Sequence, residues 1–235
     1  MIKTKTSCKE CSNLNCLIKK SCLDTDFVEV EQNKVAYKIR KKQPVFEQEN
    51  ESNKIYFIHF GLIKIFKQGA FNKDQIVKFS IDGDILGHRG LIPQNVYPVS
   101  GLAITETQIC SFSKEYFFQL MMKIPQLSIN LSLIFSNELC HEETKLRDMS
   151  IFNVREKVAK GLLLLITKFG MNDKNEINNS EFLSRQDIAE FVGLTSNQVT
   201  KVLSELKTDK LIETKGKKIK ILSKESLQEI VSYLT

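Results

Sequence analysis

The sequence lacks the features that mark membrane proteins, secreted proteins and the common classes of enzyme. No apolar segment follows Met1, and the longest aliphatic run, "LLLLI" at 162–166, is far too short to cross a bilayer. There is no Walker loop, no HExxH, no G-x-S-x-G and no paired-carboxylate constellation, and the three histidines lie in three different predicted elements. We therefore expect a cytoplasmic protein that neither sits in a membrane nor catalyses a reaction.

The composition is that of an ordinary globular protein with a mild positive charge. Its 235 residues are 42% hydrophobic and 26% charged, which allows one large domain or two modest ones with a real core. The net charge of +6 suits an anionic partner without identifying one. Because cytosolic thiols are kept reduced, the six cysteines favour a metal, cluster or redox role over structural disulfides.

From position 35 to about 112 the pattern is rich in short β-strands. Apolar and polar residues alternate in segments separated by Gly61, Gly69, Gly83 and Gly101. Several short strands at regular spacing predict a small antiparallel barrel or roll rather than a parallel α/β sheet. The strand candidates read "VAYKI", "KIYFIHFG", "LIKIFKQG", "QIVKFS" and "GLAITETQICSFS".

The stretch 126–149 contains no Gly or Pro and reads as one long helix. Along it runs a stripe with alternating spacings of four and three residues, as a seam between paired helices requires. The stripe either pairs with its two-fold mate in a homodimer or packs on the chain's own domain. In a dimer its one glutamate would face a like charge and make pairing conditional. The stripe consists of Phe135, Leu139, Glu142, Leu146 and Met149.

The segment "FLSRQDIAEFVGLTSNQVTKVLSELKTDKLIETKGKKIKILS", which starts at position 182, predicts two helices joined by a tight turn. Ser184 followed by Asp187 is an N-cap signal for the first helix. Gly193 can take the positive φ that ends this helix, and Thr195 or Ser196 can cap the second. With the following hairpin, "LIETKGKKIKIL", the pattern is a winged helix-turn-helix.

The second helix of such a motif can read base edges in a major groove. Between 201 and 220 the chain has seven lysines against three acidic residues, so lysines of the hairpin should neutralise phosphates and make binding salt-dependent. The alternative is a helical hairpin used for protein contact. The candidate DNA-contacting residues are Ser184, Arg185, Ser196, Asn197, Gln198, Thr200, Lys201, Lys215, Lys217 and Lys218.

The stretch "LSRQDIAEFVGLTSNQVTKVLSELKTDKLI" resembles the C-terminal domain of the Crp/Fnr superfamily of bacterial transcription regulators, and the upstream order of elements is similar as well. The resemblance covers nearly the whole chain. It implies an α+β fold, a homodimer on a two-fold symmetric site in double-stranded DNA, and RNA polymerase as a further partner. The implied domains are a cysteine-rich segment (1–26), a cyclic-nucleotide-binding-like β-roll or jelly roll (27–123), a dimerisation helix (124–150) and a winged helix-turn-helix domain (151–235).

Two departures from the family pattern bear on specificity. Relatives that read a guanine-rich half-site carry Glu and, four residues later, Arg, where this chain has Asn197 and Lys201. The target site is therefore not expected to be the same. Relatives that bind cyclic nucleotides carry a Gly-Glu pair and an Arg followed by Ser or Thr. Here the two places read "GH" at 87–88 and "YP" at 97–98, so cyclic nucleotide binding is not expected.

Positive charge is nevertheless available near the end of the roll. Lys78 and Arg89 could supply it, although neither matches the family motif by position. We expect His88 and Arg89 to form a polar turn, with a different small anion left open as a ligand.

The other branch of the family senses oxygen or redox state, and its resemblance implies a [4Fe–4S] cluster. Its ligands are three N-terminal cysteines and one cysteine near the end of the roll, a place that Cys110 matches in this chain. The gap between Cys16 and Cys22 matches the family's last N-terminal pair, whereas the rest, C-x2-C-x4-C, does not reproduce the better-known spacing. We expect Cys11, Cys16, Cys22 and Cys110 as ligands, with Cys8 as the alternative to Cys11.

Other readings of the cysteines stay open. Four N-terminal cysteines within 15 residues could hold zinc or form a reversible thiol switch without Cys110. The chain could also be a regulator without metal, gated by another small ligand or constitutive. Cys140 falls in the long helix and is expected to be a small buried residue.

Overall fold

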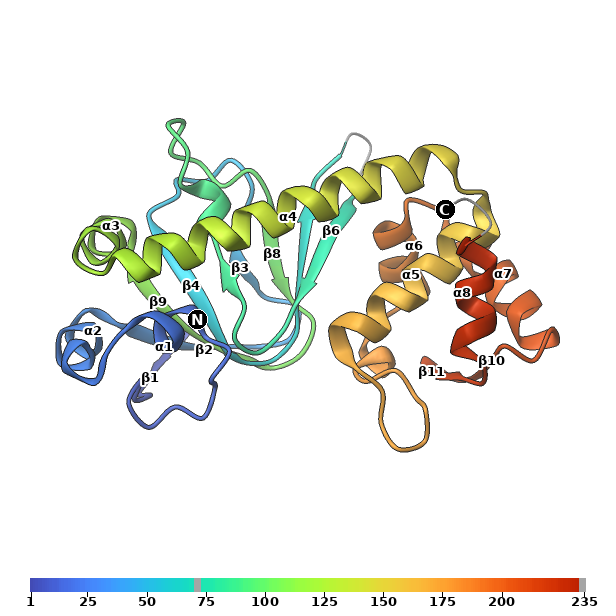
Figure 1. Cartoon of the computed structure of the whole chain (residues 1–235), viewed down its shortest axis with the longest axis horizontal. Coiled ribbons are helices and arrows are strands. Elements are labelled where there is room, and N and C mark those ends of the chain that lie inside the picture. Colours follow the sequence, from blue (N-terminus) through green and yellow to red (C-terminus); the bar gives the residue numbers. More distant parts are fainter. Residues whose placement is uncertain (70–72, 233–235) are drawn as a thin grey trace. The chain divides into compact units, whose positions relative to one another are not determined.

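A computed structural model of the chain describes residues 1–69 and 73–232. The chain divides into two compact units (Figure 1). The first unit comprises Met1–Gln68 and Val77–Cys140, and the second comprises Gly69–Ile76 and His141–Thr235. The division falls inside the longest helix, α4 (Pro125–Ile151).

The first unit is built on two antiparallel sheets that form a roll. Five strands lie in the order β1-β2-β9-β4-β7, and four lie in the order β3-β8-β5-β6. The strands are β1 (Ile2–Thr4), β2 (Val35–Ile39), β3 (Pro44–Phe46), β4 (Lys54–Phe60), β5 (Ile63–Lys67), β6 (Gln75–Ser80), β7 (Ile85–Leu86), β8 (Ser100–Ala103) and β9 (Thr107–Ser113).

β9 is the middle strand of the larger sheet, and this position explains why it carries so few exposed residues. It pairs antiparallel with β2 on one side and β4 on the other, and Cys110 lies opposite Ala36 and Phe57. Both edges of β9 are hydrogen-bonded to neighbouring strands, and its residues are buried over almost its whole length. Cys110 is therefore held rigidly within the roll.

Three short helices accompany the roll, and none of them stands out in the sequence. They are α1 (Leu17–Ser21), α2 (Phe27–Asn33) and α3 (Lys114–Lys123). The Ser113 side chain accepts a hydrogen bond from the Tyr116 amide and so caps α3. Leu127 and Leu131 of α4 are buried in the same core as Phe117 of α3, which ties the start of α4 to the roll.

The second unit is a winged helix-turn-helix. It contains α5 (Val154–Phe169), α6 (Arg185–Val192), α7 (Ser196–Thr208), β10 (Ile212–Lys215), β11 (Lys218–Ile221) and α8 (Lys224–Ser232). Three 3₁₀ turns complete the described chain: Asp24–Asp26, His88–Gly90 and Ser180–Phe182.

The predicted caps and turn of the helix-turn-helix are confirmed. Ser184 Oγ accepts a hydrogen bond from the Asp187 amide at 3.0 Å, and Thr195 rather than Ser196 caps α7. Gly193 ends α6 with φ 72°, a left-handed conformation that favours glycine. The buried faces of the two helices consist of Ile188, Ala189, Val192, Val199, Val202, Leu203 and Leu206.

The polar stretch 171–180 shows no strand pattern in the sequence, but part of it pairs with the wing. Ile177 N donates to Ile219 O, and Ile221 N donates to Asn175 O, both at 2.9 Å. This segment is too short to show a strand periodicity, so the pairing depends on the wing that lies beside it.

The predicted fold class is confirmed in both units: an antiparallel β-roll, a long helix and a C-terminal winged helix-turn-helix. The expectation for Cys140 is wrong, because its side chain is exposed on α4 rather than buried. Among the described residues, no helix combines the length and the apolar character needed to span a membrane.

Candidate functional site

The exposed face of α7 carries the side chains that the sequence predicted for DNA contact. Asn197 and Lys201 lie one turn apart with exposed side chains, as a helix that enters a groove requires. Thr200 Oγ1 donates to the Ser196 carbonyl at 2.8 Å, so its hydroxyl is engaged within the helix. Asn197 and Lys201 are therefore the side chains best placed to reach base edges.

Two of the predicted DNA-contacting residues have structural duties in capping. Gln198 Oε1 accepts a hydrogen bond from the Thr195 amide at 2.9 Å. Ser184 donates through its hydroxyl to Asp187 Oδ2 at 2.5 Å and accepts from the Asp187 amide. Because these polar atoms close the two capping boxes, they hold the helix-turn-helix in shape.

The wing presents the predicted basic surface. Lys215, Lys217 and Lys218 are exposed, and the Lys218 ammonium lies 3.3 Å from Glu176 Oε2. Arg185 Nη2 donates to the Gly216 carbonyl at 3.3 Å, which joins the start of α6 to the tip of the wing. Arg185 is thus half-buried, and its role in fixing the wing was not foreseen from the sequence.

Four cysteines line one pocket at the edge of the roll. Cys8, Cys11 and Cys16 come from the N-terminal segment, and Cys110 comes from β9. Aromatic side chains of β4 and β9, Phe57 and Phe112, and the imidazole-bearing His59 complete its wall. The structure therefore brings together residues that are about a hundred positions apart in the chain.

Cys22 is placed differently from the prediction. It follows α1, packs against the same hydrophobic core as Cys16, and is absent from the lining of the cysteine pocket. Cys8, expected only as an alternative to Cys11, lines the pocket together with Cys11. The turn of α1 carries the chain away from the pocket after Cys16, and sequence spacing alone does not reveal that direction.

Polar groups accompany the thiols. The Lys34 ammonium donates to Cys8 Sγ at 3.3 Å. Thr6 Oγ1 lies 3.5 Å from Cys110 Sγ, and His59 Nδ1 lies 3.4 Å from Cys11 Sγ. Lys34 and His59 were not singled out from the sequence, because neither lies near the cysteines along the chain.

Burial keeps the thiols of Cys8, Cys16 and Cys110 protonated. It raises the pKa of Cys8 to about 12 and that of Cys16 to about 11, and it also raises the pKa of Cys110. The charge of Lys34 opposes this rise at Cys8. A metal bound here would have to displace these protons, since cysteine ligates as the thiolate.

The donor chemistry of the pocket fits a soft metal or an iron–sulfur cluster. Four of the six cysteines surround one partly apolar pocket, and thiolates are soft donors. Within residues 1–69 and 73–232, no three His, Cys, Asp or Glu side chains already stand close enough to hold a metal ion. The pocket therefore fits a metal or cluster by the kind of residues that line it and not by their present distances. Ligation would draw the thiols closer together.

The stripe predicted as a helix-pairing seam is largely uncovered within this chain. Phe135, Leu139, Leu146 and Met149 are 38%, 61%, 69% and 38% exposed. The first turns of α4, with Leu127 and Leu131, are buried on the roll. Phe135 also contacts the His88 ring of the roll, with ring centroids 5.3 Å apart, so both the dimer seam and packing on the chain's own domain stay open.

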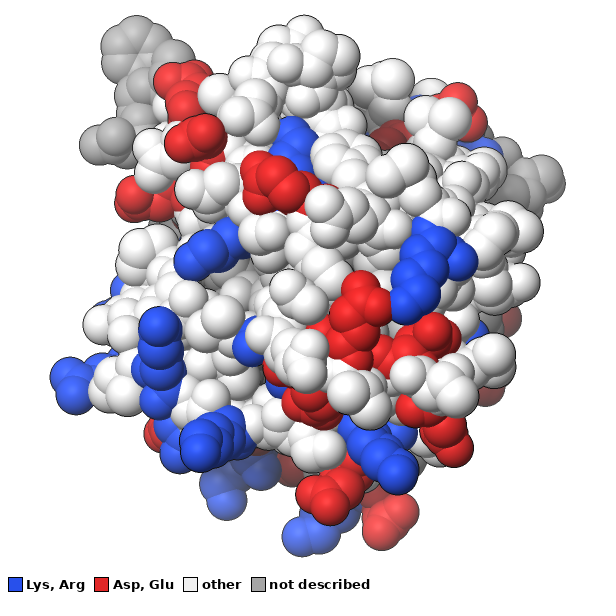
Figure 2. Space-filling model, turned by 90° about the vertical axis from the view of Figure 1, so that its left-hand side faces the viewer, with Lys and Arg blue, Asp and Glu red and all other residues white. Residues whose placement is uncertain are grey.

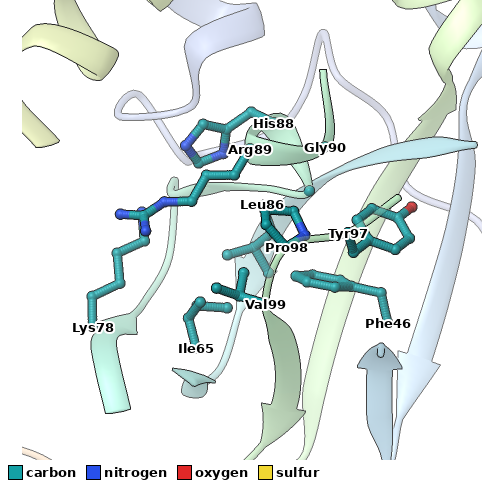
Figure 3. A pocket seen from close by; sticks show the side chains of 11 residues that line it. Phe46, Ile65, Lys78, Leu86, His88, Arg89, Gly90, Tyr97, Pro98 and Val99 are labelled. Carbon is teal, nitrogen blue, oxygen red and sulfur yellow. The ribbon is translucent and has the colours of Figure 1, made fainter. Parts of the chain in front are cut away.

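A second pocket is lined by residues of both places, 87–88 and 97–98, at which the chain departs from the nucleotide-binding motifs. Figure 3 shows Phe46 beside Tyr97 at one end and Lys78 with Arg89 at the other. The Phe46 and Tyr97 ring centroids are 4.6 Å apart, and Tyr97 Oη donates to the Lys54 carbonyl at 2.8 Å. The lining consists of Phe46, Ile65, Lys78, Leu86, Gly87, His88, Arg89, Gly90, Tyr97, Pro98 and Val99, among which there is no carboxylate.

Charge is mixed on the face of the molecule shown in Figure 2. Lys and Arg side chains gather toward the lower left of this view, and Asp and Glu side chains lie beside and above them. No single sign of charge covers this face.

Two family sequence profiles match the chain. Residues 37–124 match the Cyclic nucleotide-binding domain, and residues 156–230 match the Crp-like helix-turn-helix domain. The first match covers the roll and α3, and the second covers most of α5 and the winged helix-turn-helix that follows it.

Curated relatives extend the match over most of the chain. The Fumarate and nitrate reduction regulatory protein of Vibrio cholerae is 25% identical over 229 residues, which cover 95% of this chain and 89% of the relative. The Transcriptional activator protein Anr of Pseudomonas protegens is 25% identical over 184 residues, 78% of this chain and 75% of that protein.

Among solved structures, FixK2 from Bradyrhizobium japonicum superposes with a TM-score of 0.77 at 20% identity. The match covers 86% of this chain and 99% of FixK2. This likeness supports the arrangement of the roll, the long helix and the helix-turn-helix as a common fold.

Proposed function

Because this chain belongs to the Crp/Fnr superfamily of DNA-binding transcription regulators, we propose that it acts as a homodimer whose affinity for DNA is set by a cysteine-bound iron–sulfur cluster. The observation that carries the proposal is the convergence of Cys8, Cys11, Cys16 and Cys110 on one pocket. The signal is then oxygen or redox state. The relatives named for fumarate and nitrate reduction and for Anr support this assignment of signal.

DNA binding belongs to α7 and the wing. Asn197 can pair bidentately with adenine, and Lys201 can donate to guanine acceptors. Lys215, Lys217 and Lys218 would contact phosphates and fix the register of the protein on the duplex. A dimer would place two copies of α7 in successive major grooves of a two-fold symmetric site. RNA polymerase would be the further partner of the DNA-bound dimer.

The cluster ligands that the structure supports best are Cys8, Cys11, Cys16 and Cys110. A [4Fe–4S] cluster bound there would supply a group that oxygen can dismantle. Lys34 would offset its negative charge from the side of Cys8, and Thr6 would do the same as a hydrogen-bond donor to Cys110. Phe57 and Phe112 would limit water access, and Cys22 would take no part.

The link from cluster to DNA runs through the N-terminal segment and α4. α1 packs through Leu17 and Ile18 on the core that also holds Leu127 and Leu131 of α4. Loss of the ligated geometry would loosen this packing at the start of the helix that carries the dimer seam. The domain limits expected from the sequence, with 1–26 as the sensing segment and 124–150 as the dimerisation helix, suit this route.

The proposal is tested by anaerobic purification followed by iron and sulfide assays and by DNA binding before and after exposure to air. We expect about four iron and four sulfide per protomer and weaker DNA binding after air exposure. A colourless protein without iron would exclude the cluster, and zinc in its place would favour the zinc alternative. DNA binding that is identical with and without bound iron would exclude the control mechanism.

The dimer seam gives a separate prediction. Leu139→Glu is expected to raise the dimer dissociation constant by about 10- to 100-fold, since the two-fold axis places the new charge twice beside Glu142. Sedimentation of the anaerobic protein measures this constant. Asn137→Glu adds the same charge to the outer side of α4 and should leave the constant unchanged. Equal behaviour of the two variants would exclude this stripe as the seam.

A further inference from the structure

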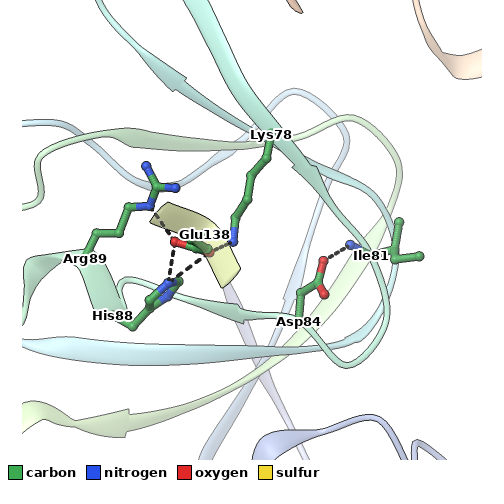
Figure 4. Close-up of polar contacts among 6 residues, drawn as sticks. All are labelled: Lys78, Ile81, Asp84, His88, Arg89 and Glu138. Carbon is green, nitrogen blue, oxygen red and sulfur yellow. Dashed lines mark hydrogen bonds and ion pairs between the residues drawn. The ribbon is translucent and has the colours of Figure 1, made fainter. Parts of the chain in front are cut away.

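Three side chains of the roll converge on one carboxylate of α4. Lys78 comes from β6, whereas His88 and Arg89 come from the 3₁₀ turn after β7, and all three contact Glu138 (Figure 4). Arg89 Nε lies 2.9 Å from Glu138 Oε2, and His88 Nε2 lies 3.2 and 3.3 Å from the two carboxylate oxygens. The Lys78 ammonium contacts Oε1. Every one of these residues belongs to the first unit.

The protonation states of this group are determined by its surroundings. Burial would raise the pKa of Glu138, but the hydrogen bond from His88 and the charge of Lys78 outweigh it and hold that pKa far below its usual range. Burial lowers the pKa of His88, so its ring is neutral. The ring therefore donates from Nε2 to the carboxylate. Its Nδ1 is buried without a hydrogen-bond partner among the described residues.

This cluster lies at the charged end of the roll pocket. Lys78, His88 and Arg89 all line the pocket, whose remaining wall is largely apolar. The roll thus offers two cations and a neutral donor at the place where an anionic ligand would be recognised. The carboxylate that meets them comes from α4 of the same chain, with its side chain only 16% exposed.

The same contact positions the start of the dimer seam. Phe135 precedes Glu138 by three residues, so the two side chains lie on neighbouring positions of one helix face. The Phe135 ring centroid is 5.3 Å from that of the His88 imidazole. His88 therefore touches both the buried carboxylate and the first residue of the seam.

We propose that the charged end of the roll pocket is a carboxylate-binding site whose resident ligand is Glu138, which anchors α4 without any bound small molecule. This inference does not depend on the iron–sulfur cluster. The roll lacks the nucleotide-binding motifs but still holds the long helix through an anion. That anion is Glu138, which α4 itself supplies. A small anion that binds Lys78, His88 and Arg89 would therefore compete with Glu138 for them.

Removing the carboxylate tests the site by chemical rescue. Glu138→Ala deletes Cγ, Cδ and two oxygens, which together have the size and charge of acetate. We expect amide hydrogen exchange in peptides spanning 131–140 to accelerate roughly tenfold in Glu138→Ala. About 100 mM acetate should restore slow exchange, whereas chloride at equal ionic strength should not, because only acetate can take both the charge and the hydrogen bonds.

Two further variants make the outcome decisive. Glu143→Ala removes an exposed carboxylate of the same helix and should leave exchange in 131–140 unchanged, with or without acetate. In a Lys78→Met, Arg89→Gln background, Glu138→Ala should add little further acceleration and acetate should lose its effect, since the partners are coupled. If Glu138→Ala does not fold, Glu138→Gln keeps the shape without the charge and is measured instead against wild type. Exchange that does not rise, or that responds equally to acetate and chloride, overturns the proposal.

Discussion

Replacing Cys8 with serine is expected to strip the anaerobically purified protein of bound iron, whereas replacing Cys22 is expected to leave the iron content unchanged. Cys8 lines the pocket that also contains Cys11, Cys16 and Cys110, and Cys22 does not. A serine hydroxyl is a hard donor and a poor substitute for thiolate at iron or zinc. Substitutions of the partners behind metal ligands already cost about 10- to 100-fold in affinity, so the loss of a ligand should exceed about tenfold.

The measurement is iron and sulfide per protomer together with the visible spectrum of each variant. Cys140→Ser is the matched control, since Cys140 is an exposed thiol on α4 and should have no effect. The variants Cys11→Ser, Cys16→Ser and Cys110→Ser should behave like Cys8→Ser. If Cys22→Ser lost its iron while Cys8→Ser kept it, the set predicted from sequence spacing would be right and the pocket assignment wrong.

The second large effect concerns DNA binding, to which α7 and the wing are expected to contribute in different ways. Asn197→Ala or Lys201→Ala should weaken binding to a selected site by about 1–3 kcal/mol per half-site and relax the preference at one base position. In a dimer the loss occurs twice. Binding to random duplex should change much less, because base contacts do not contribute to it.

Substitutions in the wing should instead weaken binding to specific and random duplex alike. Replacing Lys215, Lys217 and Lys218 together by glutamine removes up to six phosphate contacts per dimer. The slope of log K against log salt should then fall by about 0.9 for each lost contact, for specific and random duplex alike.

The measurement is a salt titration of DNA binding on a site selected from random-sequence duplex. Lys224→Gln removes one exposed charge at the start of α8 and serves as the control for charge alone. A wing variant that alters base preference but leaves the salt slope unchanged would contradict this assignment.

The elements that could be predicted from the sequence are those governed by local rules. The ends of α6 and the start of α7 could be predicted from Ser184, Gly193 and Thr195. Caps and left-handed turns depend on neighbouring residues alone. The long helix and its apolar stripe follow in the same way from a period repeated over many residues. Short helices such as α1 and α2 were not predicted, because five to seven residues are too few to show a helical period.

Residues whose partners lie far along the chain could not be assigned from spacing. Gln198 is a predicted DNA-contacting residue, and its further role of closing the cap of α7 was not assigned from the sequence. Lys34 is 26 residues from Cys8 and still touches its sulfur. Glu138 looked like one more polar residue on a helix surface, and only the packing of α4 on the roll places it among Lys78, His88 and Arg89.

By itself the sequence determined the kind of protein this is: a roll, a long helix and a winged helix-turn-helix of the Crp/Fnr superfamily, with thiols grouped near the N-terminus. These follow from periodicity, capping and motif, which are properties of neighbouring residues. Tertiary structure alone shows that Cys8 lines the same pocket as Cys110 whereas Cys22 is absent from its lining, and that a carboxylate of α4 meets the cations of the roll. Both depend on the direction in which a helix packs on a sheet, and that direction is set by the whole core.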